Sequence, residues 1–349
     1  MKKIFFILLS AMLLTACDDT STFKRSAVGN PYEVLVVCTQ EFWDAPAGRA
    51  LEEVLDTDIP GLPQSERSFR ISRTEQLTNL TKPFRNIINI DIDNRLYSRT
   101  MFKYSNDIFA RSQVVMTIQS PSRDDFEQFV RDNAQVIVDF FTAVEMNRQI
   151  ESLKQKHNAT ALETVKEMFG CELMIPVEMS GEKRGKDFVW LSDFNSVNPE
   201  ILSFVMYSYP YTSVDNFSLE NYIQKRDSVM KVNMPGGKPG QYIQTEKDYV
   251  TITETSHRDR YLQVTRGLWY MEGDMMGGPF VSHAVVDEMN NRVIVVEAFV
   301  YAAGQKKGKF TRKLEASLYT LKLPADKLIE NSIHIPQVVI DADEENKQN

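Results

Sequence analysis

Alternation of apolar and polar residues is clearest between residues 261 and 323, and the rest of the chain is organised around this stretch. Residues 262–270 alternate, 280–286 follow after a loop, and 293–301 form an apolar run rich in β-branched side chains. These patterns are typical of β-strands, so we predict three antiparallel strands joined by a loop and a turn. A covering helix is predicted after them from the spacing of Phe310, Leu314, Leu318 and Leu321.

The N-terminal part of the chain alternates strand and helix patterns. Strands are predicted at 32–38, 86–92 and 114–118, and helices at 45–55 and from Pro121 to about residue 156. The capping box that Thr160 and Glu163 form predicts a shorter helix, which ends at Gly170.

The C-terminal part repeats this order. A strand at 201–209 and a helix at 218–231 precede the turn 234–241, whose Pro/Gly composition resembles that of 59–64. We therefore predict an α+β fold of two related halves, each a mostly antiparallel sheet covered by helices on one face, in β-α-β-β-β-α order. An ancient duplication and a coincidence between two turns both explain the repeat.

The first residues have the pattern of a bacterial lipoprotein signal. Lys2 and Lys3 precede a short apolar core, and Leu14-Thr15-Ala16-Cys17 fits a lipobox. The core is shorter than the ~20 residues that span a bilayer, which favours a cleaved signal. We expect a diacylglyceryl thioether and N-acylation at Cys17, although an ordinary signal peptide with an incidental cysteine is the alternative.

This N-terminus sets the predicted organisation and location. We expect a signal peptide at 1–16, a flexible tether at 17–30, a first half at 31–179, a second half at 180–340 and a disordered acidic tail at 341–349. The lipid would anchor the protein in the cell envelope, at the outer membrane, and the periplasmic and surface faces both stay open. The membrane is thus one expected partner.

Composition narrows the classes of partner. The net charge is −8 without a basic cluster, which argues against nucleic-acid binding. Cys38 and Cys171 lie beside apolar runs, where buried free thiols are favoured over a disulfide, although export would permit one. No nucleotide-binding, metal-binding or nucleophile-elbow motif is present in the sequence, so no cofactor or metal is predicted.

The loop 271–279 is the best candidate ligand site in the sequence. It carries Glu272 and Asp274, follows Arg266 and Trp269, and precedes His283 in the next strand. Aromatic side chains suit stacking on a glycan or peptide, and paired carboxylates suit acid–base hydrolysis. A plain hairpin loop, with its aromatic residues packed and its carboxylates in water, is the simpler interpretation.

A second candidate lies just before the predicted helix at 310. Lys306 and Lys307 precede the start of this helix, where a helix N-terminus can bind an anion. Short charged loops are usually only solvated, and that interpretation is favoured.

Three features together resemble one known family. They are the lipobox, the segments 266–269 and 276–283, and the run Glu297-Ala298-Phe299-Val300-Tyr301. The chain resembles the domain-of-unknown-function family 4837 of Bacteroidota cell-envelope lipoproteins over nearly its whole mature length. The resemblance implies a cell-envelope lipoprotein and brings no established activity, substrate or catalytic residue.

Two classes of function follow from these observations. The first is a non-enzymatic envelope lipoprotein that binds or scaffolds another envelope protein or a glycan. The second is an envelope hydrolase that acts on glycan or peptide with the loop 271–283 as its site. We favour the first, because the sequence carries no recognisable catalytic motif.

Overall fold

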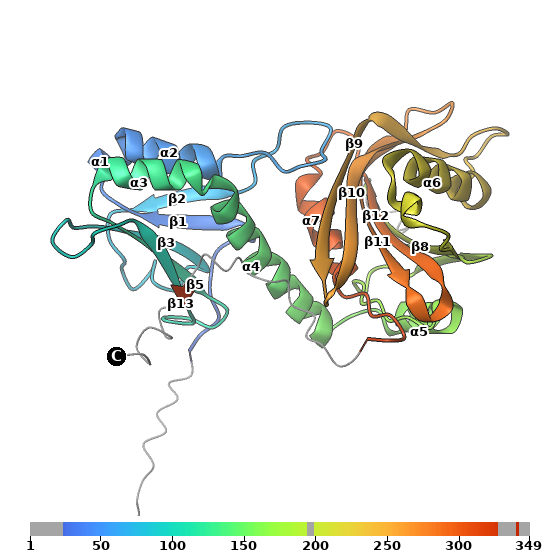
Figure 1. Ribbon diagram of the computed structural model, residues 1–349, viewed down its shortest axis with the longest axis horizontal. Helices are drawn as coiled ribbons and strands as arrows, with labels where there is room; N and C mark the ends of the chain where they lie inside the picture. Colours follow the sequence, from blue (N-terminus) through green and yellow to red (C-terminus); the bar gives the residue numbers. More distant parts are fainter. Residues whose placement is uncertain (1–23, 194–198, 327–339, 342–349) are drawn as a thin grey trace, which may run out of the picture.

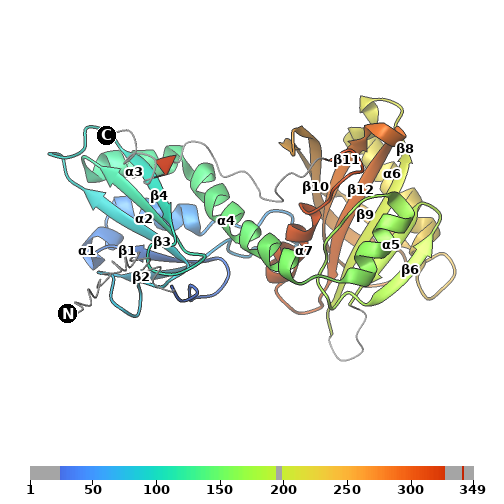
Figure 2. The same ribbon diagram turned by 90° about the horizontal axis from the view of Figure 1, so that it is seen from below.

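The structure, a computed structural model, describes residues 24–193, 199–326 and 340–341 (Figure 1). Two β-sheets with their helices form two lobes, and the long helix α4 (Ala134–Gln155) runs from the first lobe to the second (Figures 1 and 2). The predicted α+β class is confirmed. Cys17 and the predicted signal peptide lie outside the described residues.

The first lobe is built on a sheet with strand order β13-β4-β5-β3-β1-β2. Its strands are β1 (Glu33–Val37), β2 (Arg70–Thr74), β3 (Asn86–Ile92), β4 (Met101–Asn106), β5 (Val114–Ser120) and β13 (Ile340–Asp341). Strand β1 pairs in parallel with β2 and β3, β3 pairs in parallel with β5, and β13 pairs in parallel with β4. Of the described pairings in this sheet, only β4–β5 is antiparallel.

The prediction of a mostly antiparallel sheet is therefore wrong for the first lobe. Strands β1, β3 and β5 contain near-continuous apolar runs, as is typical of parallel strands buried on both faces. A helical crossover also joins β1 to β2, and parallel neighbours require such a connection.

Helices cover one face of this sheet. They are α1 (Gln40–Asp44), α2 (Pro46–Leu55), α3 (Arg123–Asp132) and the first part of α4 (Figure 1). Val34 and Val36 of β1 face the helices and share a core with Phe126 of α3, whereas Leu35 packs on the opposite face. The helix predicted from Pro121 begins at Arg123 and is broken at Asn133, where α4 starts.

The second lobe contains the antiparallel sheet that the sequence predicts. Its order is β6-β7-β8-β12-β11-β10-β9, and each described pairing is antiparallel. The three strands predicted first correspond to β10, β11 and β12. The strands are β6 (Gly181–Gly185), β7 (Phe188–Ser192), β8 (Ile201–Pro210), β9 (Ile243–His257), β10 (Arg260–Met271), β11 (Gly277–Asp287) and β12 (Arg292–Tyr301).

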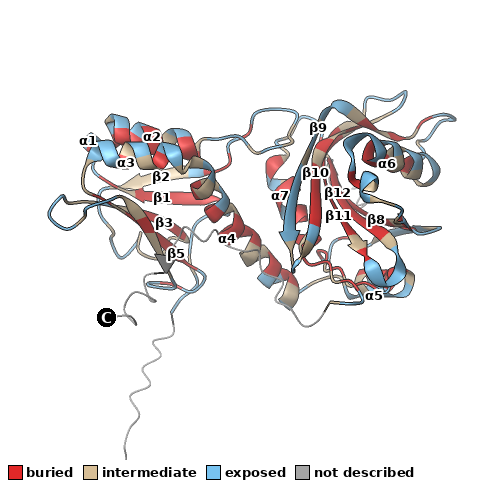
Figure 3. Cartoon of the chain, in the orientation of Figure 1, coloured by how far each residue is buried: buried red, intermediate tan, exposed pale blue. Residues whose placement is uncertain are grey.

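Helices cover both faces of the second sheet rather than the one face predicted. Helices α5 (Ala159–Phe169) and α7 (Gly308–Leu318) pack on one face, and α6 (Leu219–Asn233) packs on the other (Figure 3). Strand β12 shows why, because Ile294 lies in the α5/α7 core and Val295 in the α6 core. Short 3₁₀ turns, η1 (Val214–Phe217) and η2 (Glu288–Asn290), precede α6 and β12.

The two lobes share an order of elements but not a topology. The order β-α-β-β-β-β-α occurs in each, with one strand more than predicted. Their sheets differ in strand order and direction, so the lobes are not two copies of one fold. Helix α5, which we expected in the first half, packs in the second core. None of the helices within the described residues is long and apolar enough to cross a membrane.

Candidate ligand-binding cleft between the lobes

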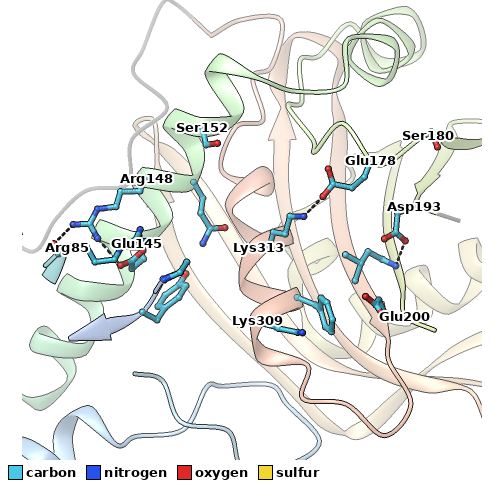
Figure 4. Close-up of a pocket in the computed structure, with 15 residues that line it drawn as sticks. Arg85, Glu145, Arg148, Ser152, Glu178, Ser180, Asp193, Glu200, Lys309 and Lys313 are labelled. Atoms are coloured by element: carbon cyan, nitrogen blue, oxygen red, sulfur yellow. Dashed lines mark hydrogen bonds and ion pairs between the residues drawn. The ribbon is translucent and has the colours of Figure 1, made fainter. Parts of the chain in front are cut away.

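The largest described cavity lies where α4 of the first lobe faces α7 of the second. Its volume is about 900 Å³, and side chains of both lobes line it (Figure 4). Pockets of about 300–1,000 Å³ are typical of small-molecule sites. The lining residues are Pro31, Tyr32, Arg85, Glu145, Arg148, Gln149, Ser152, Glu178, Ser180, Asp193, Glu200, Leu202, Lys309, Phe310 and Lys313.

The wall from the first lobe is a network around Glu145. Its carboxylate accepts hydrogen bonds from Arg85 Nη2 at 2.7 Å, Asn86 Nδ2 at 2.7 Å and Arg148 Nη1 at 2.8 Å. Arg148 Nη2 also donates to the backbone oxygen of Arg85 at 2.8 Å. Glu145 is buried, whereas the side chains of Arg85 and Arg148 stay 19% and 14% exposed. The guanidinium groups therefore lie fixed at the cavity surface.

This network carries an excess of positive charge. Two guanidinium groups face one carboxylate, so one positive charge is not balanced within it. Burial lowers the pKa of Arg148 to about 10, and the charge of Glu145 opposes that effect, so Arg148 stays charged at neutral pH. The Nε atom of Arg85 is buried, and no described group accepts its hydrogen bond. This wall is suited to an anionic group.

Helix α7 places Lys309 and Lys313 between the two ends of the cavity (Figure 4), and its Phe310 also lines the cavity. Lys313 forms an ion pair with Glu178. The Nζ of Lys309 lies 4.4 Å from the centre of the Phe310 ring. Helix α7 thus contributes both charge and apolar surface to the cavity.

The opposite wall, in the second lobe, is acidic. Asp193, just after β7, accepts a hydrogen bond from the backbone N–H of Leu202 at 2.7 Å, and Glu200 accepts one from Gln305 at 3.2 Å. Within the described residues neither carboxylate has a lysine or arginine partner within salt-bridge distance. Burial raises the pKa of Asp193, and the neighbouring Glu178 adds to that rise. A bound cation would stabilise both carboxylates.

Contacts of α7 with the first lobe hold the cavity open in a defined geometry. Glu66 accepts hydrogen bonds from the backbone N–H of Lys307 at 2.6 Å and of Gly308 at 3.0 Å. The guanidinium of Arg312 lies 4.0 Å from the centre of the Tyr32 ring and donates to the backbone oxygen of Ser68. The first lobe therefore caps the second lobe's helix.

These contacts bear on the anion site predicted at Lys306 and Lys307. The helix N-terminus is occupied by the carboxylate of Glu66, which fills the position that an external anion would take. The Nζ of Lys307 donates to the backbone oxygen of Gln305, and Lys306 lines a separate cavity of about 490 Å³. The start of α7 therefore binds a protein carboxylate.

The residues predicted around the loop 271–279 do not form one site. Arg266 forms an ion pair with Glu315 of α7, and burial, which would lower its pKa, is outweighed by that carboxylate, which raises it. Trp269 is buried in the α6 core, where its Nε1 donates to the backbone oxygen of Val300 at 3.3 Å. Both side chains therefore have structural roles.

The acidic pair of that loop is separated from His283. Glu272 and Asp274 are exposed, whereas His283 is buried and packs 4.5 Å from the ring centre of Tyr319. His283 lies six residues along β11 from Gly277, or about 20 Å at ~3.3 Å per residue. Burial lowers the pKa of His283, with Arg266 adding to the effect. The geometry for a hydrolase at 271–283 is thus not present.

Sequence reasoning missed the residues that line the cavity. Arg85 and Glu145 are 60 positions apart and meet only in the folded lobe. One local sign was present, since Glu145 follows Val144 on the apolar face of α4, and a buried carboxylate there needs partners.

The two described cysteines form no disulfide, and the described residues contain no group that could hold a metal ion. Cys38 and Cys171 are free and buried, in the cores of different lobes, so they form no disulfide with each other. Burial raises the pKa of Cys171 to about 12. Over residues 24–193, 199–326 and 340–341, no group of three histidine, cysteine, aspartate or glutamate side chains is arranged to hold a metal ion.

Comparison with protein families divides the chain where the lobes divide. Residues 158–320 match the family described as Domain of unknown function (DUF4837). Residues 27–154 match a second family, described as Domain of unknown function (DUF8532). The resemblance to family 4837 therefore covers the second lobe, and not nearly the whole mature chain as predicted. The division coincides with the end of α4 and the start of α5.

Other comparisons add little. No curated protein matches the chain. A solved structure of the human StarD13 (DLC2) lipid transfer and protein localization domain shares 9% identity, with 46% of this chain and 97% of that chain covered. Its TM-score of 0.19 supports no argument about fold or ligand.

Proposed function

We propose that this protein is a lipid-anchored cell-envelope protein that binds a small ligand in the cleft between its two lobes. The observation that carries the binding role is the cavity itself, about 900 Å³ in volume and lined by charged side chains from both lobes. Its charges are held in place by the three donors to Glu145 and by the Lys313–Glu178 pair. Fixed polar groups in a concave site favour specific binding.

The proposed location rests on the N-terminal sequence. Leu14-Thr15-Ala16-Cys17 supplies the thiol that lipid attachment requires, after a short apolar segment. The described structure begins at Lys24, and the first lobe follows within a few residues. Thioether and amide-linked chains together would hold the protein stably on a membrane, whereas one chain alone binds weakly.

Native mass spectrometry of the lipidated protein, extracted from its own envelope, tests the binding role. We expect a non-covalent 1:1 adduct that is released on denaturation. The variant S152W/S180W places two indole groups in the cleft at exposed lining positions and should lose the adduct. The matched variant S228W/S256W, exposed on α6 and β9, should keep it. Equal adducts in both variants would place the ligand outside the cleft.

Metabolic labelling with a clickable fatty acid tests the anchor. Cys17→Ser removes the thiol, and no hydroxyl replaces it in a thioether, so the variant should take up no label while the folded lobes stay intact. Label uptake equal to that of the unmodified protein would show that the lipid is attached elsewhere. Fractionation alone would mislead, because an uncleaved signal could retain the variant on the membrane.

A further inference from the structure

The charges of the cleft are separated along its length. Arg85 and Arg148 lie at one end, with the excess positive charge of the Glu145 network. Asp193 and Glu200 lie at the other end, across α7 (Figure 4). A ligand that fills the cavity thus meets cations at one end and carboxylates at the other.

The wall that α4 contributes offers a hydrogen-bond acceptor without a partner. Gln149 of α4 lines the cavity close to the Tyr32 hydroxyl, and its buried Oε1 atom accepts no hydrogen bond from a described group. A buried acceptor left unpaired costs about 1–3 kcal/mol, so this position favours a ligand that brings an N–H group. Phe310 and Leu202 supply apolar surface in the same lining.

We propose that the ligand is a short zwitterionic peptide, with its carboxylate at Arg85 and Arg148 and its ammonium group at Asp193 and Glu200. An amide N–H of the peptide backbone would donate to Gln149 Oε1. The two charged ends match the two walls, and the amide matches the unpaired acceptor of Gln149. This inference rests on the proposed binding function and adds the chemical class of the ligand.

The proposal predicts how blocking each end of a peptide changes affinity. The probes are unmodified alanine peptides from the dimer to the pentamer, with their N-acetylated and C-amidated forms, titrated calorimetrically into the complete chain. At the length that binds best, either blocking group should weaken binding about tenfold or more, because each removes one charge-assisted contact.

Side-chain variants assign the ends. Arg85→Gln should weaken the unmodified peptide about tenfold and leave the C-amidated peptide unchanged, since the carboxylate contact is already lost there. Glu200→Gln should behave in the same way with the N-acetylated peptide. Arg95→Gln and Glu288→Gln, at exposed positions outside the cleft lining, are matched controls that should bind as the unmodified protein does.

The outcomes separate this proposal from the binding function. Equal weakening of free and blocked peptides by Arg85→Gln and Glu200→Gln would overturn the assignment of the ends. Failure of every peptide in the series, beside a native adduct that S152W/S180W removes, would overturn the ligand class and keep the cleft as the site. If Arg85→Gln does not fold, the Glu200→Gln arm decides, because Glu200 accepts only one described hydrogen bond.

Discussion

Arginine and glutamate form a buried network in each lobe, and the two networks differ in balance. In the first lobe Arg85 and Arg148 share Glu145, and both guanidinium groups reach the cleft. In the second lobe Arg226 of α6 pairs with Glu297 of β12, and both side chains are 0% exposed. The network of Arg85, Arg148 and Glu145 thus has one unbalanced positive charge beside the cavity, and we call it the open network. The Arg226–Glu297 pair is fully buried, and we call it the closed network.

The Arg226–Glu297 pair has the geometry of a structural element. Arg226 donates to Glu297 through Nε at 2.9 Å and Nη2 at 2.7 Å, and through Nη1 to Thr245 at 2.8 Å. Its guanidinium lies 4.2 Å from the centre of the Phe280 ring. Burial alone would lower the pKa of Arg226, but the charge and hydrogen bonds of Glu297 raise it. The difference teaches that balance and exposure, rather than the residue pair itself, distinguish a binding surface from a core contact.

The largest effect is expected in the closed network. Glu297→Gln removes the bidentate counterion of Arg226 and leaves Asp227, whose Oδ1 lies 3.8 Å from Arg226 Nη1, as the remaining described carboxylate within salt-bridge distance. The variant should lower the free energy of unfolding by about 3–5 kcal/mol, because the guanidinium stays buried with only this weaker partner. Chemical denaturation followed by fluorescence measures it.

The double variant R226M/E297L is its control, because a well-packed apolar pair avoids the uncompensated charge. It should be more stable than Glu297→Gln alone. If the double variant is less stable than Glu297→Gln, the Arg226–Glu297 pair stabilises the fold by more than the neutralisation of one buried charge.

An intermediate effect is expected in the open network. Glu145→Gln removes the carboxylate that three donors share, and should cost about 1–3 kcal/mol in the free energy of unfolding. The loss is smaller than at Glu297 because Arg85 and Arg148 can reach water. Chemical denaturation of Glu145→Gln and Glu297→Gln under the same conditions compares the two losses in the free energy of unfolding. A larger loss for Glu145→Gln would contradict the difference between the two networks.

A smaller effect is expected where the lobes meet. Glu66→Gln weakens the cap on α7 by removing the charge that faces the helix N-terminus, and should cost about 0.5–2 kcal/mol. Hydrogen exchange at the first turn of α7 should increase at the same time. Unchanged exchange there would show that Glu66 does not hold the two lobes together.

The smallest effect is expected in the loop 271–279. Glu272 and Asp274 are exposed, and the variant E272Q/D274N should change the free energy of unfolding by less than about 0.5 kcal/mol. It should also leave the native adduct intact. Loss of the adduct in this variant, with the fold unchanged, would show that the loop 271–279 contributes to ligand binding.

The sequence predicted the second sheet better than the first, for a physical reason. Strands β10, β11 and β12 are neighbours in sequence and in space, so local alternation and two turns specify their pairing. In the first sheet β5 pairs with β3 rather than only with β4, and β1 lies between β2 and β3. Such partners are chosen by long-range packing, which no local pattern records.

The cleft was beyond local patterns for the same reason. Its position depends on α4 reaching α7, where Met146 and Ile150 pack against Ala316. Trp269 and His283, which stood out in the sequence, are core residues whose aromatic surface is buried. The aromatic and titratable residues that lie close together in the sequence therefore belong to the core of the second lobe. The cavity is lined instead by residues that are far apart in the sequence.

A ligand-bound structure of the lipidated protein, purified from its own envelope without added ligand, tests the central claim most directly. We expect electron density for one molecule between α4 and α7, with an anionic group within hydrogen-bond distance of Arg85 and Arg148. A molecule seated elsewhere, or a cleft that holds only water while the native adduct is present, would contradict the account.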